Sequence, residues 1–205
     1  MQLDAAATPD VARRSAVASR LLEAFLACPV KCRLLSEGEI PAGTEYSAWA
    51  AEREESYRLE GIRNLTPQET GSGIASREPG FWKHESWQFA VGETVRAQGW
   101  VAEVALIQRI PQTGTPSRLV PIRFAANNRL SASDKTMAAF EAIALAKALG
   151  TKTGTAKIVY GEKLATISVN AAALSRAVHR KVSQVASLLT ATIGPPSITY
   201  ARQRP

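Results

Sequence analysis

Apolar residues recur at helical spacing in four parts of the chain, and three of these parts have clear start or stop signals. Thr8 and Pro9 are typical of a helix start, and Pro29 is typical of a residue just beyond a helix end. Ser133 and Gly150 mark the two ends of the third helix. The predicted helices cover residues 8–28, 44–61, 134–149 and a last stretch that turns five apolar residues inward, namely Leu174, Val178, Val182, Val185 and Leu189. The apolar stripe predicted for the third helix comprises Met137, Phe140, Ile143, Ala144 and Ala148.

Alternating apolar and polar residues predict five strands between these helices. Residues 86–91 and 94–110 are separated by Gly92 and Glu93, which have the composition of a hairpin turn. Further strands cover residues 118–125, 156–160 and 163–169, and residues 66–80 form a turn-rich loop. This order of elements predicts an α/β fold, in which one mixed β-sheet is flanked by helices on both faces. We expect a single domain over residues 1–205.

Bulk composition is consistent with that expectation. A chain with 45% hydrophobic and 21% charged residues has the composition of an ordinary water-soluble protein. No apolar run approaches the roughly 18 residues that a membrane span needs, and the first residues lack the pattern of a secretion signal. We therefore expect a cytoplasmic protein with no membrane partner.

Charge is distributed very unevenly along the chain. Residues 1–103 have a formal charge of −4, whereas residues 104–205 have +11 and contain only three acidic residues. A strongly basic half is expected in a protein that binds a polyanion, and nucleic acid is the first candidate. The alternative is that the basic residues serve solubility alone.

The chain contains two cysteines, Cys28 and Cys32, which are too few for the disulfide framework of a small secreted protein. Two thiolates also cannot complete a tetrahedral metal site by themselves. The alternatives are two ligands of a larger site, or a small buried side chain with an incidental neighbour. His84 and His179 are isolated in polar surroundings, and we assign them no role.

The element order resembles the core of PD-(D/E)XK nucleases, in which a helix, a three-strand meander, a crossover helix and a further strand follow one another. The segments that sharpen the resemblance are Phe25-Leu26-Ala27-Cys28-Pro29, Asp134-Lys135 with Ala139-Phe140, Ala144-Leu145 and Gly150, and residues 154–161 with Ile158-Val159-Tyr160-Gly161. They are similar to the RecB-like branch of the superfamily, which includes the CRISPR adaptation nucleases, and in particular to a little-characterised subfamily. The resemblance covers roughly residues 10–198.

The resemblance implies hydrolysis of phosphodiester bonds with Mg²⁺ or Mn²⁺ held by carboxylates of neighbouring strands. Glu103 occupies the place of the first strand acid and would be both a catalytic residue and a metal ligand. The next strand reads Pro121-Ile122-Arg123 and supplies no acid in either register. Arg123 would take the lysine position, where an arginine can hold a phosphate but cannot coordinate a metal. A carboxylate from the crossover helix, Asp134 or Glu141, would then complete the metal site.

The same branch holds an iron–sulfur cluster, for which Cys28 would be the first ligand. Such a cluster typically takes about four thiolates, and the branch supplies the other three from a C-terminal cysteine-rich stretch. This sequence ends close to where that stretch would begin, so we expect an incomplete cluster and a truncated or degenerate family member.

Three functions follow as hypotheses. The first is a metal-dependent DNA nuclease or a remnant of one. The second is a catalytically inactive domain that binds DNA, as single strands or ends, through phosphate contacts. The third is an interaction domain whose charge is incidental. The basic residues expected to contact nucleic acid are Arg118, Arg123, Lys135, Lys147, Lys157, Arg176, Arg180 and Lys181.

Overall fold

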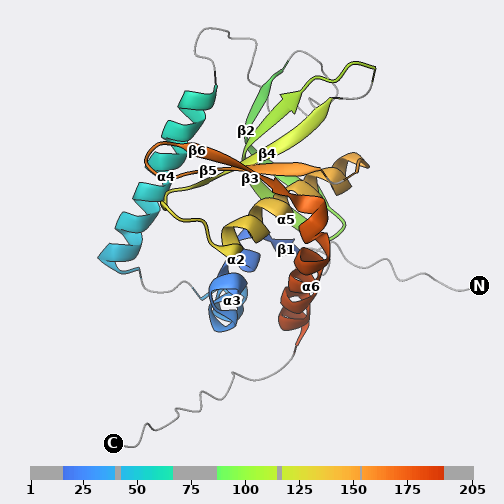
Figure 1. The fold of residues 1–205 in the computed structure, drawn as a ribbon. Helices are drawn as coiled ribbons and strands as arrows, with labels where there is room; N and C mark the ends of the chain where they lie inside the picture. Colours follow the sequence, from blue (N-terminus) through green and yellow to red (C-terminus); the bar gives the residue numbers. More distant parts are fainter. Residues whose placement is uncertain (1–15, 40–42, 67–86, 115–116, 153, 192–205) are drawn as a thin grey trace, which may run out of the picture.

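The computed structural model describes residues 16–39, 43–66, 87–114, 117–152 and 154–191 (Figure 1). The helices are α2 (Ser19–Ala27), α3 (Pro29–Ser36), α4 (Glu45–Leu65), α5 (Ala132–Leu149) and α6 (Ala171–Thr190). The strands are β1 (Val17–Ala18), β2 (Phe89–Ala97), β3 (Trp100–Ile110), β4 (Arg118–Ala125), β5 (Thr155–Tyr160) and β6 (Ala165–Asn170). These elements confirm the predicted α/β class and its mixed sheet.

The sheet is built around β3. Strand β2 pairs antiparallel with β3 along most of one edge. The other edge of β3 pairs with β1, parallel, at Trp100 and Val101, and with β4, antiparallel, over residues 106–110. Strand β5 continues the sheet parallel to β4, and β6 is antiparallel to β5. Between β1 and β4, the backbone N–H of Glu103 donates to the hydroxyl of Ser19 over 3.0 Å instead of to a strand.

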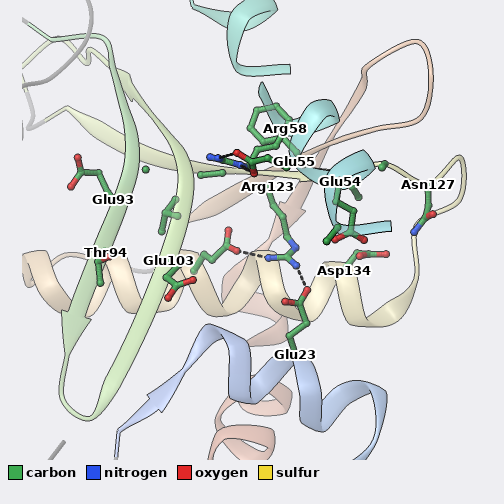
Figure 2. A pocket seen from close by; sticks show the side chains of 18 residues that line it. Glu23, Glu54, Glu55, Arg58, Glu93, Thr94, Glu103, Arg123, Asn127 and Asp134 are labelled. Atoms are coloured by element: carbon green, nitrogen blue, oxygen red, sulfur yellow. Dashed lines mark hydrogen bonds and ion pairs between the residues drawn. The ribbon is translucent and has the colours of Figure 1, made fainter. Parts of the chain in front are cut away.

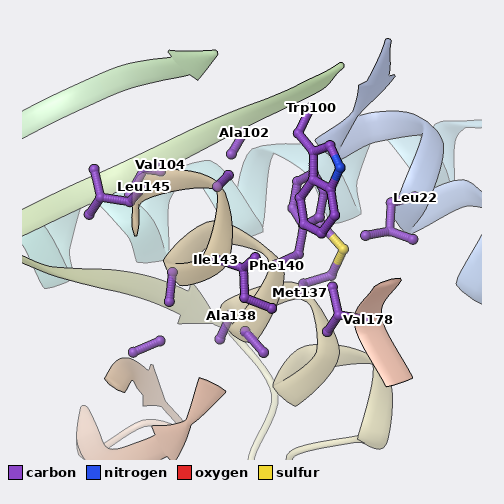
Figure 3. Close-up of a cluster of buried hydrophobic side chains, with 14 of the residues drawn as sticks. Leu22, Trp100, Ala102, Val104, Met137, Ala138, Phe140, Ile143, Leu145 and Val178 are labelled. Carbon is purple, nitrogen blue, oxygen red and sulfur yellow. The ribbon is translucent and has the colours of Figure 1, made fainter. Parts of the chain in front are cut away.

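Helices lie on both faces of this sheet. In the view of Figure 1, α2, α3, α5 and α6 gather below the sheet, whereas α4 stands apart at its side. Ile62 of α4 packs into an apolar cluster formed by one sheet face, with Phe89, Leu106, Ile122 and Val159 at its centre. The larger cluster lies on the opposite face and includes most of α5 (Figure 3). There the ring of Trp100 stacks on Phe140 with centroids 5.0 Å apart and planes 8° from parallel.

Helix α5 is buried over every residue from 137 to 146, which is wider than the stripe predicted from the sequence. It contacts strands β2 to β6 and also α2 and α6. The predicted cap at Ser133 is wrong, because Ser131 is the N-cap and forms a capping box with Asp134. Ala148, which we expected in the apolar stripe, is exposed.

The N-terminal helix differs from the prediction at both ends. Its expected first turns, residues 8–15, lie outside the described residues. Val17 lies in β1, where it pairs with Trp100, and α2 begins only at Ser19. Pro29 does follow the end of α2, but it also occupies the first turn of α3, where a proline is well tolerated because it lacks only an N–H that would have no helical partner.

The turn predicted at Gly92 and Glu93 is also wrong, because both residues lie inside β2 and the connection to β3 is Gln98-Gly99. Gly92 has a φ of +69°, a left-handed conformation within a strand that favours glycine. Near Gly92 the alternation of side chains along the hairpin is interrupted, so that residues two positions apart face opposite sides of the sheet. Val104 of β3 packs in the α5-side cluster, whereas Leu106, two residues on, packs in the α4-side cluster.

The C-terminal half follows the prediction more closely. Strand β6 is shifted by one or two residues from the predicted 163–169. In the N-terminal half, α4 extends beyond the predicted end at Gly61. In α6, Val178, Val182 and Val185 are buried as predicted.

Helix α4 crosses β4 at Gly61, its one buried residue. A Cβ atom added there would lie 2.4 Å from Cε1 of Phe124. Alanine at an ordinary helical position gains about 1 kcal/mol over glycine, but here we expect Gly61→Ala to lower the free energy of unfolding by about 1–3 kcal/mol through overpacking. Urea denaturation measures the change, with Ser56→Ala on an exposed part of α4 as the control. A stabilised Gly61→Ala variant would contradict the packing described here.

Candidate functional site

The candidate site is a cavity of about 640 Å³ between α4, the β2–β3 hairpin, the end of β4 and the start of α5 (Figure 2). Its lining is strongly acidic. The charged residues that line it are Glu23, Glu54, Glu55, Arg58, Glu93, Glu103, Arg123, Asp134 and Glu141. Seven of these side chains are acidic and two are basic.

The cavity forms because β3 and β4 separate at this point. Their antiparallel ladder ends at the pair Leu106↔Ile122. In a continued ladder Arg123 would face Ala105 and Ala125 would face Glu103, but neither pair is formed. Residues 123–125 instead pair only with β5. The cavity therefore lies next to the part of the hairpin where successive alternate residues face opposite sides of the sheet. Gly92 itself lines the cavity.

Arg123 lies at the centre of the charged side chains (Figure 2). Its Nη1 donates to Oε1 of Glu141 over 2.9 Å, and its Nη2 donates to Oε1 of Glu23. The Glu141 side chain is 2% exposed and that of Arg123 is 19% exposed, whereas that of Glu23 is 59% exposed. The guanidinium thus connects a buried carboxylate of α5 to a surface carboxylate of α2.

The ionisation of this pair reflects burial and neighbouring charge. Burial lowers the pKa of the Arg123 guanidinium, but the charges of Glu141, Glu23 and Asp134 outweigh it and the net shift is upward. Burial raises the pKa of the Glu141 carboxyl, and the neighbouring Arg123 limits that rise. Nε of Arg123 and Oε2 of Glu141 are both buried without a hydrogen-bond partner. Leaving these two polar atoms buried and unpaired lowers the stability of the fold. Both atoms belong to the same ion pair, that of Arg123 with Glu141.

The two predicted metal ligands are not brought together in a coordinating group. Glu103 is exposed on β3, and Asp134 accepts hydrogen bonds from the backbone N–H and the hydroxyl of Ser131. Within the described ranges, no group of three His, Cys, Asp or Glu side chains could hold a metal ion. The carboxylates nearest the guanidinium, those of Glu23 and Glu141, already bind it. With Arg123 between them, these two carboxylates do not fit Mg²⁺ or Mn²⁺.

The basic residues predicted to contact nucleic acid are divided between different environments. Arg118, Lys135, Arg176 and Arg180 are exposed. Lys157 is half-buried and donates to Oε1 of Gln108 over 2.9 Å. The other two lysines contact aromatic rings, as Nζ of Lys147 lies 4.5 Å from the centroid of Trp100 and Nζ of Lys181 lies 5.6 Å from that of Phe25. Arg123 lies in the acidic cavity.

Cys28 and Cys32 lie one turn apart at the start of α3, the first exposed and the second fully buried. Burial raises the pKa of the Cys32 thiol, as expected for a packing residue. His179 is exposed on α6 and its ring lies 5.0 Å from that of Trp100. His84 lies outside the described residues.

Sequence reasoning identified Arg123 and Glu141 but missed Glu23. Glu23 is an exposed acid on an amphipathic helix, and its spacing there does not distinguish it from other surface acids. Its pairing with Arg123 joins residues 100 positions apart in the sequence.

A scan against protein-family models and a search of the curated proteins found no match to this chain. Among the described helices, none combines the length and the apolar character that crossing a membrane requires.

Proposed function

We propose that this chain is a DNA-binding domain on a nuclease-like framework, and that it binds phosphates without cleaving them. The observation that supports the proposal is the solvent-exposed side of α6. No acidic residue occurs among the 20 residues of that helix, and its three basic residues fall within two turns. Single strands or DNA ends are the proposed targets.

Arg176 and Arg180 are four residues apart and both exposed, so they project from neighbouring turns of the same face. Lys181 lies beside them. Ser183 and Gln184, also exposed, add neutral hydrogen-bond donors on the next turn. Such side chains are the ones that bind phosphate oxygens and fix a protein on a nucleic acid without reading its sequence.

A fourth cation extends this surface beyond α6. The ring of Trp100 is contacted by His179 of α6 and by the ammonium group of Lys147 at the end of α5. Lys147 therefore lies close to the helix that carries the two arginines. The acidic cavity would repel a phosphate, so the proposed DNA surface is separate from the cavity.

A metal-dependent DNA nuclease is the activity that the family resemblance implies. It would need carboxylates gathered around a divalent cation, and the described residues do not provide that group. We therefore place binding ahead of cleavage.

The proposal predicts that the double variant Arg176→Gln/Arg180→Gln binds DNA more weakly and with less dependence on salt. Each phosphate contact to a single strand contributes about 0.7 to the slope of log K against log salt, so losing both should reduce the slope by about 1.4. Fluorescence anisotropy with a labelled single-stranded DNA, between about 50 and 200 mM salt, measures both quantities. Arg53→Gln/Arg63→Gln is the matched control, because it removes the same charge from exposed positions on α4.

An equal loss in both double variants would show that net charge, rather than the α6 surface, governs binding. If the unsubstituted protein does not bind DNA, the proposal is wrong and the hypothesis of an interaction domain remains. Cleavage of the DNA that requires Mg²⁺ and is lost in Glu103→Ala would instead establish the nuclease.

A further inference from the structure

The charges around Arg123 are contributed by two separate helices of the fold. Glu23 belongs to α2, and Glu141 and Asp134 belong to α5, while the arginine itself extends from β4. The first two bind the guanidinium directly, and the charge of Asp134 also acts on it. Carboxylates from separate elements thus converge on one cation, and that cation is a side chain of the protein.

Glu141 makes this cation necessary. Its side chain lies within the sheet-facing part of α5, 2% exposed, among residues that are apolar on both sides in the sequence. An isolated carboxylate in such a place is strongly unfavourable unless a positive charge lies beside it. Arginine suits this role because it retains its charge at any working pH.

We propose that Arg123 acts as a covalently attached cation in a carboxylate site, and that removing its guanidinium would allow Glu23 and Glu141 to bind a divalent cation instead. The inference deepens the proposed function, since it gives a structural reason why the cavity would not hydrolyse phosphodiesters. It does not depend on DNA binding by α6.

The expected site is chemically ordinary. Mg²⁺ and Mn²⁺ need only one or two protein carboxylates when water completes their coordination. Glu23 and Glu141 each contact a different nitrogen of the same guanidinium, so an ion of this size in the space it vacates could reach both. Asp134 would keep its capping role and act through its charge or through a bound water.

The test is a Mn²⁺ titration of the full chain and of Arg123→Ala, followed by electron paramagnetic resonance of the free ion and by thermal unfolding. The unsubstituted protein should neither deplete the free Mn²⁺ signal saturably nor change its Tm. Arg123→Ala should unfold at a lower temperature without the ion, deplete the signal saturably, and recover part of its Tm as the site fills. Mg²⁺ should compete for the same site.

Three control variants define the mechanism. Arg123→Lys keeps a cation and should stay insensitive to Mn²⁺. Arg58→Ala removes the other arginine that lines the cavity, which pairs with Glu55, and should gain no Mn²⁺ binding. Arg123→Ala/Glu141→Gln removes the buried charge together with its cation, and it should regain Tm over Arg123→Ala and lose the response to Mn²⁺.

Two results would overturn the inference. One is saturable binding of Mn²⁺ by the unsubstituted protein that Glu23→Gln or Glu141→Gln abolishes, since the site would then take a metal beside Arg123. The other is an Arg123→Ala variant that neither binds Mn²⁺ nor gains Tm from it. Should Arg123→Ala be unfolded without the ion, recovery of its circular dichroism on adding Mn²⁺ becomes the measurement, and failure to recover counts against the inference. Neither result affects the α6 proposal, which the arginine pair of α6 tests separately.

Discussion

Phe140→Ala is expected to lower the free energy of unfolding by about 3–5 kcal/mol, enough to threaten the fold of a protein of ordinary stability. Phe140 is fully buried in the middle of α5, and its ring stacks on Trp100 of β3. Alanine would remove the transfer free energy of the ring and leave a cavity between the helix and the sheet. Because α5 is covered on all sides, its surroundings can collapse only partly into that space.

Urea denaturation followed by circular dichroism measures this change. Phe140→Leu is the graded control, since it keeps much of the volume and should cost distinctly less. Leu59→Ala removes an apolar side chain that is 48% exposed on α4, and it should change stability only slightly. A loss below about 1 kcal/mol for Phe140→Ala would mean that the site is not packed as described.

Glu141→Leu should cost about 3 kcal/mol or more, because it leaves the guanidinium of Arg123 without its buried partner. Glu141→Gln should cost much less, since its amide oxygen can still accept the hydrogen bond from Nη1. Glu103→Gln is the matched control at an exposed acid of the same cavity. Comparable losses in Glu141→Leu and Glu141→Gln would contradict a role for the hydrogen bond.

The same carboxyl predicts a pH dependence. Burial raises the pKa of Glu141 in the folded protein above its ordinary value of 4.5. A raised carboxyl pKa stabilises the fold fully below the unfolded-state pKa, and that contribution is lost as the pH rises through the folded-state value. Glu141→Gln cannot ionise, so its stability relative to the unsubstituted protein should improve as the pH rises above about 4.5. Urea midpoints measured across this range give the difference.

Local signals in the sequence predicted the element types well but several of their ends poorly. Ser131 and Ser133 both suit a helix cap, and the structure selects Ser131 because Asp134 then lies three residues on and returns a hydrogen bond. Gly92 and Gly99 both suit a turn. The choice between them depends on pairing along the whole of β2 and β3, which no short window of sequence contains.

The candidate site was predictable only in part. The place of Arg123 within the strand 118–125 was evident, and so was the lack of an acid in that strand. Its environment was not, because the sequence suggested a phosphate ligand whereas the structure places its guanidinium between Glu23 and Glu141. Glu141 was one of two candidate acids on α5. Its burial follows from the packing of α5 against the sheet, where Glu141 pairs with Arg123 of β4, a tertiary contact without a local signal.

The position of α5 has a consequence for how the molecule folds and unfolds. This helix contacts α2 near the beginning of the described chain and β5, β6 and α6 near its end. Neither the strand meander nor the C-terminal elements can bury their facing apolar side chains until the helix is in place, and the helix is stable only when both cover it. Partial unfolding of either half would expose the same hydrophobic surface. The two halves are therefore expected to lose structure together, in one cooperative transition, rather than as independently folding units.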